Sequence, residues 1–538
     1  MQTLKFIKSY FLKNKKKYFL YVSISLILSL LSISSPLITG RMLDSLLATK
    51  RVEVIYFYSF FYAIIAIFQI VFSYFLTIVG TKLNSEISFQ ISQDTIVQIQ
   101  KANLKLTENM DSAYTVQRIN LDANSVTNFS LSFSSGLISN GILIIISFIY
   151  ILVNTKLLAI TSIFVVGFFA LIYRYKKKVL DSINYKFKES YTKYFSTEQN
   201  QLRYLVLIKI NSLYQHFYKK LNSKFIDYYK ILLRKNKTEF LFKSSDLMLS
   251  FILQIVLFLY GGIQILNGIL SIGTFTVISS YLKNVIAGFD YFATLSTQMI
   301  ESDVSVQRIK QYFLYKTDLN GEKRINDINE IKVSDLSFKF NDIYLINNLN
   351  LILKKGNIYK ISGENGKGKT TLLFLLIGLY AQQYQGDIFY NHININELDM
   401  DYIRKNYICF ITQLDYMIND SFLNNFFIDF NSGDERKKLN NLCEHYSLTY
   451  LINRYSHNTE IVSDDQLSGG EKKKINIIRG MLKSNKKIIL LDETNVFLDE
   501  KSRLTLKNDL KELKKENIII LVSHEEYFDD IVDEIIYL

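Results

Sequence analysis

The sequence predicts a chain of two parts: an all-α membrane domain of six transmembrane helices with long cytoplasmic extensions, fused to an α/β domain of the P-loop class. Apolar residues make up 49% of the 538 residues and gather in long runs before about residue 290, which is a membrane-protein distribution. A glycine-rich loop at 363–370 and an apolar strand with two acids at 488–493 predict the second part. We expect the membrane domain at 1–310, a polar linker at 311–329 and the α/β domain at 330–538.

Six apolar runs are candidates for membrane spans, since crossing about 30 Å of hydrocarbon takes roughly 20 helical residues. They are residues 18–38, 54–79, 131–153, 157–173, 247–266 and 272–292. The fourth is short and the sixth contains Lys283 and Asp290, so a buried soluble helix is the alternative for these two. The first is too long for the apolar part of a cleaved signal peptide and lacks its cleavage site, so we expect it to be retained.

Basic residues orient these spans. Four precede the first span and four follow the fourth, namely Lys13, Lys15, Lys16, Lys17 and Arg174, Lys176, Lys177, Lys178. The positive-inside rule then places the N-terminus and the two long loops in the cytoplasm, against the weaker signal of Lys50 and Arg51 in an external loop. The net charge of +13 is explained by this topology and by anionic lipid, so no nucleic acid is expected as a partner. The two cysteines, Cys409 and Cys443, suit a reducing cytoplasm.

The glycine-rich loop has the residues that phosphate binding needs. It reads Gly363, Glu364, Asn365, Gly366, Lys367, Gly368, Lys369 and Thr370, with Thr371 next. The glycines let backbone N–H groups face the phosphates, Lys369 reaches the β and γ oxygens, and the Thr370 hydroxyl ligates Mg²⁺. Residues 357–361 suit a strand and 371–377 a buried helix, the context that this loop requires; a chance match in a flexible turn is the alternative.

Two acids end the apolar run 488–491, which has the pattern of a central parallel strand. We expect Asp492 to hold Mg²⁺ and Glu493 to accept a proton from the attacking water. A solvated strand end is the alternative. A second aliphatic run, 518–522, ends in Ser523 and His524; His524 would reach a γ-phosphate, although a lone histidine there is usually polar surface. Together the two motifs predict binding and hydrolysis of ATP.

A further tetrapeptide, Leu467-Ser468-Gly469-Gly470, lies between the loop and the acidic strand end. In order and spacing these motifs resemble the nucleotide-binding domains of ABC transporters. The resemblance implies that Ser468, Gly469 and Gly470 contact, in trans, a nucleotide held by another subunit; a helix N-terminus there would favour phosphate. It also implies a catalytic set of Glu493, His524 and Gln413, a Mg²⁺ set of Thr370, Gln413 and Asp492, and a D-loop that ends at Leu498-Asp499.

Several positions depart from the family's pattern. Phe340 stands where a tyrosine usually stacks on adenine, and it keeps the aromatic face. Glu471 replaces a more common glutamine, and Val496 and Phe497 replace two small residues, which leaves the details of the dimer contact open. Residues 459–466 lack the usual Gly-Glu of exporters. Because the sequence ends at residue 538, we expect the family's C-terminal helices to be missing.

The membrane part resembles that of ABC exporters. The loops between spans 2 and 3 and between spans 4 and 5 are long, polar and free of proline, as helices that continue into the cytoplasm would be. Residues 114–122 and 207–211 are similar to the coupling segments of exporters. Residues 267–275 resemble the tight turn into the sixth helix, and residues 315–324 suit the linker.

The resemblance implies an ATPase coupled to transport, a half-transporter in the cell membrane with its ATPase domain in the cytoplasm. It binds ATP and Mg²⁺ and pairs with a second copy, which we favour over a related half-transporter. We expect export of a hydrophobic or amphipathic substrate by alternating access, and favour a peptide of the bacteriocin or modified-peptide type over a drug or a lipid. With no peptidase-like segment before the first span, leader cleavage is not expected. Two competing functions are a nucleotide-gated sensor or channel that pumps nothing and a soluble ATPase that sits on membranes.

Overall fold

The computed structural model describes residues 2–107, 110, 112–315, 320–340, 343–380, 383–427, 433–455, 461–462, 466–494, 497–523 and 526–538. The chain divides into two compact units. One contains Met1–Val97 and Asp111–Leu314, and the other contains Gln98–Met110 and Tyr315–Leu538. A short cytoplasmic segment between the second and third long helices therefore belongs to the unit that carries the nucleotide motifs.

The first unit is helical, and each predicted span lies in one long helix. Its elements are α1 (Gln2–Lys13), α2 (Lys15–Thr49), α3 (Val52–Gln100), α5 (Ser112–Asn154), α6 (Lys156–Arg203), α7 (Leu205–Ile210), α8 (Tyr214–Leu266) and α9 (Ile272–Phe313). Within the described residues, α2, α3 and α5 are apolar over a length that can cross a membrane. The apolar stretches of α6 and α8 are shorter, Lys156–Val165 and Ser250–Leu266.

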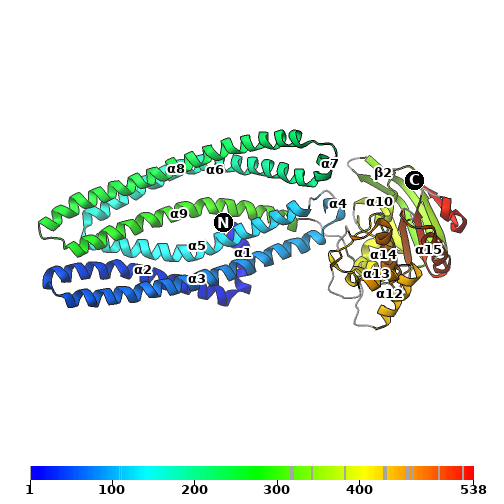
Figure 1. Ribbon diagram of the computed structural model, residues 1–538, viewed down its shortest axis with the longest axis horizontal. Helices are drawn as coiled ribbons and strands as arrows, with labels where there is room; N and C mark the ends of the chain where they lie inside the picture. The colour runs from blue at the N-terminus through cyan, green and yellow to red at the C-terminus, as the bar shows by residue number, and fades with distance from the viewer. Residues whose placement is uncertain are drawn as a thin grey trace. The chain divides into compact units, whose positions relative to one another are not determined.

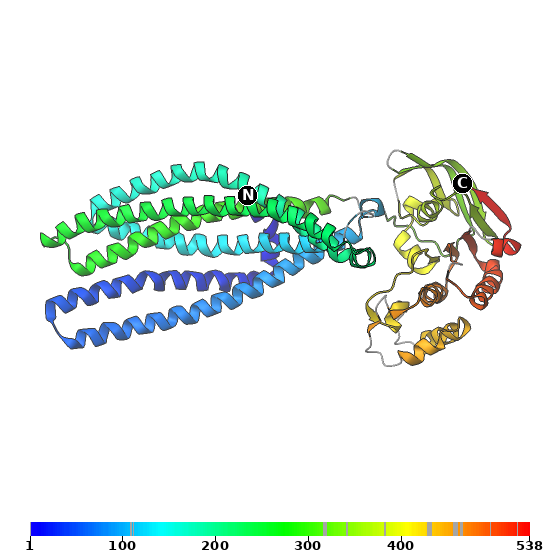
Figure 2. The same ribbon diagram turned by 45° about the horizontal axis from the view of Figure 1, so that its top comes forward.

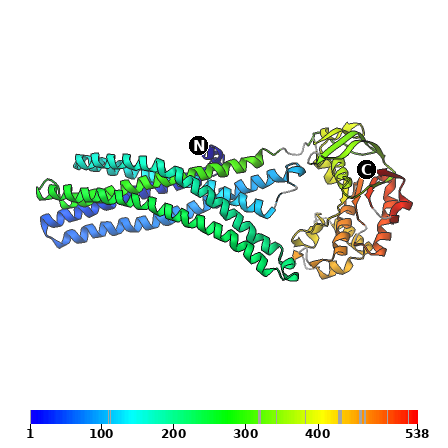
Figure 3. The same ribbon diagram turned by 90° about the horizontal axis from the view of Figure 1, so that it is seen from above.

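The long helices pack in groups. α5 packs along α9 and α2, while α6 and α8 run side by side to the short turn helix α7 (Figures 1 and 3). α2 and α3 form a hairpin (Figure 2). At the end of α2, Lys50 adopts a left-handed conformation with φ of 50°. One apolar cluster joins Ile87 of α3, Val126 of α5 and Val306 of α9, which explains why the cytoplasmic extensions stay helical beyond the spans.

The amphipathic helix α1 was not expected from the sequence. Its Ile7 and Tyr10 are buried in the same cluster, and the hydroxyl of Thr3 donates to Asp303 of α9 at 2.6 Å. Apolar residues on one face of 2–13 were the signal for this helix. The expected turn into the sixth helix is present between α8 and α9, where Gly268 has a φ of +71°.

The structure corrects one of the two coupling segments. Residues 114–122 lie inside α5, where the buried Asp122 accepts a hydrogen bond from Ser305 at 2.7 Å and approaches Arg308 at 3.7 Å. The segment of the first loop that belongs to the second unit is instead α4 (Leu104–Thr107), whose Leu104 packs on that unit's core. The other segment, 207–211, overlaps α7.

The second unit is built on two main sheets. A parallel sheet has the order β11-β3-β10-β9-β6, and an antiparallel sheet has the order β2-β1-β4-β5. The parallel strands are β3 (Ile358–Ser362), β6 (Ile408–Ile411), β9 (Ile488–Asp492), β10 (Ile518–Val522) and β11 (Glu534–Tyr537). The antiparallel strands are β1 (Glu330–Phe340), β2 (Ile343–Lys354), β4 (Tyr384–Tyr390) and β5 (Ile393–Asn394), and β7 (Asp420–Ser421) pairs with β8 (Ile461–Val462). Both β9 and β10 are buried along their whole length, as the aliphatic runs predict.

Helices complete this unit. They are α10 (Lys369–Leu376), α11 (Met400–Asn406), α12 (Gly433–His445), α13 (Thr449–Arg454), α14 (Gly469–Met481) and α15 (Glu500–Leu513). Part of the segment expected as a linker is fastened to this unit: the Gly321 amide donates to Leu398 at 2.8 Å, and Arg324 pairs with Asp399 at 2.9 Å. The second unit therefore includes residues before β1.

Candidate active site

The phosphate-binding loop connects the end of β3 to the start of α10, as the sequence predicts. The Lys369 ammonium folds back over this loop and donates to the carbonyl oxygens of Gly363 at 2.8 Å and Glu364 at 3.1 Å. Gly366 and Gly368 have φ of +81° and +89°, a region that side-chain-bearing residues rarely adopt. The loop thus surrounds its lysine and leads directly into the N-terminus of α10, whose amides can bind phosphate.

Thr370 and Asp492 meet at the predicted Mg²⁺ position. The Thr370 hydroxyl donates to Oδ2 of Asp492 at 2.8 Å. Burial at the end of β9 raises the pKa of Asp492 above its usual value, and the nearby Glu493 raises it further, while the hydrogen bond from Thr370 opposes both effects. A hydroxyl and a carboxylate oxygen are ligands of the hard type that Mg²⁺ prefers, so these residues fit that ion.

Gln413 and Glu493 also lie together. Nε2 of Gln413, after β6, donates to Oε2 of Glu493, after β9, at 2.7 Å. β6 and β9 are neighbours in the parallel sheet, so their carboxyl ends place the two side chains at one edge. Glu493 adopts a φ of +46°, which is uncommon for a residue with a side chain and is typical of functional positions.

His524 lies outside the described residues, so its role stays a prediction. The residue before it, Ser523, is buried directly after β10. Val522 pairs with Asp492 in the sheet, and the Glu493 amide donates to the Val522 carbonyl at 3.0 Å. The chain therefore leaves β10 beside the two acids.

The Leu467–Gly470 tetrapeptide opens helix α14. Ser468 caps the helix, and its hydroxyl accepts a hydrogen bond from the Glu471 amide while the Glu471 carboxylate accepts one from the Ser468 amide at 2.6 Å. Ser468 and Gly469 are exposed. No hydrogen bond or ion pair found for the described residues joins this tetrapeptide to the chain's own phosphate loop, which leaves its helix N-terminus available to another subunit.

Glu471, which departs from the family pattern, has a structural role in this chain. The residue completes a capping box with Ser468, and it also accepts a hydrogen bond from the Tyr450 hydroxyl. Burial alone would raise the pKa of Glu471, but the hydrogen bonds from Tyr450 and Ser468 outweigh burial and lower it. The Ser-x-x-Glu spacing is a sequence signal for such a cap.

Phe340 is the last residue of β1 and pairs with Ile343 of β2. It is partly buried against the core of the unit. Leu345 of β2 lies beside the phosphate loop, because a Cβ on Gly368 would come within 3.3 Å of the Leu345 Cβ. The β1–β2 hairpin thus borders the phosphate loop, and stacking of Phe340 on adenine stays a prediction.

The D-loop bends around the start of α14. Phe497 is 71% exposed with a φ of +73°, and its carbonyl oxygen would lie 2.8 Å from a Cβ on Gly470. Two residues later, Asp499 caps α15 and pairs with Lys474 at 2.6 Å. Burial would raise the pKa of Asp499, but hydrogen bonds from Lys474 and Ser502 dominate and lower it to about 2.

The two cysteines are buried core residues. Burial raises the pKa of Cys409 to about 11 and that of Cys443 to about 12. Both thiols are therefore neutral near pH 7.

Comparison with known proteins identifies the family. The model of the ABC transporter transmembrane region matches residues 18–288, and the model described as ABC transporter matches residues 346–496. In a solved structure, a bacterial Atm1-family ABC exporter with ATP bound has a similar fold, with a TM-score of 0.87 over 97% of this chain and 94% of that one at 15% identity.

The chain spans between about half and three fifths of the length of the curated relatives it matches. The transport/processing ATP-binding protein ComA of Streptococcus pneumoniae serotype 4 is 22% identical over 427 residues, which cover 78% of this chain and 59% of ComA. The microcin-J25 export ATP-binding/permease protein McjD of Escherichia coli is 29% identical over 310 residues, or 54% of this chain and 51% of McjD. The ATP-dependent lipid A-core flippase of Pasteurella multocida is 25% identical over 300 residues, with 54% and 51% covered. With the family's transmembrane region and its ATP-binding domain joined in one polypeptide, the chain belongs to the ABC transporters.

Proposed function

We propose that this protein uses ATP hydrolysis to export an amphipathic substrate, preferably a peptide, across the cell membrane by alternating access. The observation that carries the proposal is the 2.7 Å hydrogen bond between Gln413 and Glu493 in a chain that also carries a membrane region. Hydrolysis needs a carboxylate that accepts a proton from water. A nucleotide-gated sensor or channel needs only binding, so that function leaves Glu493 without a role.

The residues divide the work of hydrolysis. Lys369 would exchange its bonds to the loop carbonyls for bonds to the β and γ phosphate oxygens, and the first amides of α10 would hold the same group. Glu493 would take the proton of the attacking water, which Gln413 would orient. Mg²⁺, held by Thr370, Asp492 and Gln413, would neutralise charge that develops on the phosphates.

Two copies would form the complete site. Ser468, Gly469 and Gly470 stand at a helix N-terminus whose amides and positive dipole end favour a phosphate. Among the described residues, no hydrogen bond or ion pair joins them to their own phosphate loop, which supports a role on the nucleotide of a partner subunit. A homodimer is the simplest arrangement, because this chain supplies both halves of such a site.

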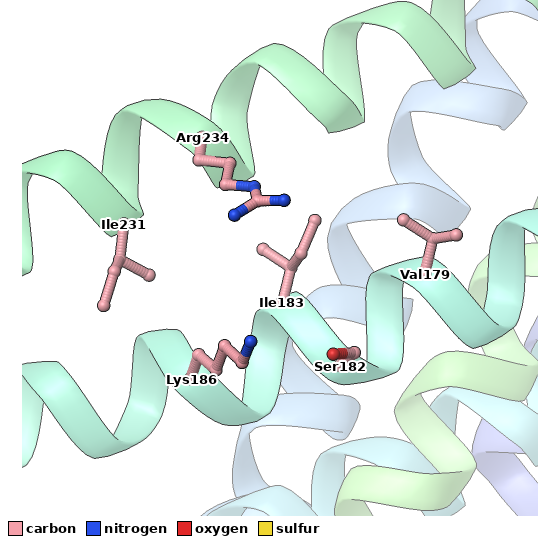
Figure 4. Close-up of a pocket in the computed structure, with 6 residues that line it drawn as sticks. All are labelled: Val179, Ser182, Ile183, Lys186, Ile231 and Arg234. Atoms are coloured by element: carbon pink, nitrogen blue, oxygen red, sulfur yellow. The ribbon is translucent and has the colours of Figure 1, made fainter.

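A peptide substrate is favoured by the names of ComA and McjD, which refer to transport and processing and to microcin export. A cavity of about 330 Å³ between α6 and α8 offers matching chemistry. Figure 4 shows Lys186 of α6 and Arg234 of α8 pointing toward one another across this cavity, with Ile183 and Ile231 beside them. Two cations next to apolar side chains suit a carboxylate on an amphipathic chain. The flippase relative makes a lipid the second candidate, and drug export remains the third.

Substitution of the proposed base tests the function. The full chain, purified in lipid nanodiscs, is compared with Glu493→Gln. The variant should lose about 10²–10⁴-fold in turnover, because general-base catalysis acts in the transition state, and should still bind ATP. Added peptides should raise wild-type turnover more than drugs or lipids do. Equal turnover of the variant and the wild type would refute the proposed chemistry, and stimulation by lipids alone would refute the peptide preference.

A further inference from the structure

The loop that carries Gln413 is held by one face of helix α14. Lys473, Asn476 and Arg479 follow one another at intervals of three residues, so they lie on one side of the helix. Each donates to the segment after β6: Asn476 to Asp415 at 2.8 Å, and Arg479 to the carbonyls of Asn425 at 2.8 Å and Tyr416 at 3.1 Å. The segment 412–425 is therefore fixed to α14 by side chains.

Lys473 makes the contact nearest to the catalytic residues. Its ammonium lies 3.1 Å from the carbonyl oxygens of Thr412 and Gln413 and 3.1 Å from Oδ1 of Asp415. An ammonium has three N–H donors, and these three acceptors match them. The Lys473 side chain is only 1% exposed, so its charge is stabilised by these partners rather than by water.

The same lysine connects two motifs that lie far apart in the sequence. Helix α14 is capped by Ser468, whose predicted role is on the nucleotide of a partner subunit. The carbonyl of Gln413 accepts from Lys473, while the side-chain amide of Gln413 donates to Glu493. A path of two hydrogen bonds therefore runs from Lys473 of α14 through Gln413 to the proposed general base.

We propose that Lys473 is a positioning residue for ATP hydrolysis, which holds the backbone of Gln413 against α14 so that the glutamine amide reaches Glu493. The inference rests on the proposed ATPase activity. The inference goes beyond that activity because it gives a role to a lysine outside the phosphate loop, the acidic strand end and the Leu467–Gly470 tetrapeptide. Closure of a partner on Ser468 would act on Glu493 through this side chain.

The test compares Lys473→Gln with a matched control in the full-length protein in nanodiscs. Lys483→Gln is the control, because Lys483 follows α14 and its ammonium also donates to two backbone carbonyls, those of Arg404 at 2.8 Å and Ile408 at 2.6 Å. We expect Lys473→Gln to lower kcat by about 10–100-fold, since small misplacements of catalytic groups have effects of this size. KM and the Kd for ATP should change by less than about twofold, because Lys369 is untouched. The control should keep wild-type kcat.

A double variant separates positioning from loss of structure. If Lys473 acts through Gln413, Gln413→Ala combined with Lys473→Gln should be no slower than Gln413→Ala alone. Multiplied losses would overturn the proposal, and so would a kcat for Lys473→Gln equal to that of the control. Should Lys473→Gln fail to fold, Lys473→Arg, which keeps the cation, is measured in its place.

A second readout does not depend on turnover. Hydrogen exchange of the backbone amides in 413–417 should be faster in Lys473→Gln than in wild type and in Lys483→Gln. An unchanged exchange rate would overturn the proposal even if the purified chain hydrolyses no ATP. Failure of the export proposal and failure of this inference are thus distinguished.

Discussion

Gly470 is a residue whose role follows from the space around it. A Cβ at this position would lie 2.8 Å from the carbonyl oxygen of Phe497, whereas a Cβ on Gly469 would lie 3.4 Å from the Phe497 ring. Alanine exceeds glycine in helix propensity by up to about 1 kcal/mol, a gain that is common to both positions. At 470 the backbone of the D-loop must move, and overpacking of this kind costs about 1–3 kcal/mol.

We therefore predict that Gly470→Ala lowers the thermal unfolding midpoint of the full chain, while Gly469→Ala leaves it unchanged or raises it. Unfolding followed by scanning fluorimetry in nanodiscs measures both. The pair is matched, since both glycines stand in the first turn of α14 and differ in what they face. Equal midpoints would show that the D-loop carbonyl yields without cost.

At the same scale, the sequence indicated where the candidate site residues lie better than which residues support them, and their chemical roles stay predictions. Asp492 ends β9, and Glu493 and Gln413 come soon after β9 and β6. Lys369 and Thr370 begin α10 after the loop that follows β3. Parallel strands bring such ends to one edge of a sheet. Lys473 was missed because nothing in its spacing distinguishes it from Lys472 and Lys474 on either side of it. Its burial depends on how α14 packs on the loop after β6, and that packing is a tertiary property.

Among the elements, apolar runs predicted the buried strands and the long helices, because length and period are local properties. The coupling segment at 114–122 was wrong for the opposite reason. Those residues continue the helical period of α5. Their Asp122 forms an ion pair with Arg308 of α9. The boundary of a short helix such as α4 depends on its packing against the core of the second unit, to which it belongs, and the sequence of the loop does not display that packing.

The segment from α6 to α8 carries a large positive charge. Residues 174–246 contain seventeen Lys and Arg against six Asp and Glu, so most of the net charge of +13 lies there. Arg234 precedes the apolar stretch Ser250–Leu266 by 16 residues, or about 24 Å of helix. That exceeds the roughly 5–8 Å of a lipid headgroup layer. An anion at the cavity in Figure 4 would therefore come from solution.

We predict that this cavity recognises the carboxylate of a peptide. Binding of a short apolar peptide with a free C-terminus should weaken about tenfold in Lys186→Gln/Arg234→Gln, because two charge-assisted hydrogen bonds are lost. The same peptide with an amidated C-terminus should bind the wild type as weakly as the free acid binds the variant. Microscale thermophoresis in nanodiscs of neutral lipid measures both.

The control removes the same charge from the same helices. Lys193→Gln/Lys235→Gln neutralises one lysine on α6 and one on α8, and each already lies near a glutamate, Glu189 at 2.6 Å and Glu239 at 3.6 Å. This variant should bind the free acid as the wild type does. An equal loss in both double variants would mean that the general positive potential of the segment, and not the cavity, attracts the peptide.

At the scale of the whole molecule, a dimer with shared sites differs from two independent ATPases in which copy supplies each motif of a site. In a two-fold symmetric pair, each site would combine the phosphate loop of one copy with the Ser468–Gly470 segment of the other. A copy that carries Lys369→Ala and a copy that carries Ser468→Arg are each defective alone. In the mixed pair, sharing in trans leaves one site intact, whereas sites within one chain leave none.

We predict that differently tagged copies, purified as mixed dimers, trap nucleotide with vanadate at one site per dimer. Neither variant should trap nucleotide as a homodimer, and dimers of differently tagged wild-type copies should trap it at two sites. Absence of trapping in a mixed pair that co-purifies intact would contradict the shared site, and the exposed N-terminus of α14 would then need another partner. Failure of wild-type copies to co-purify would instead make a related half-transporter the required second subunit, because an isolated helix N-terminus cannot close a site by itself.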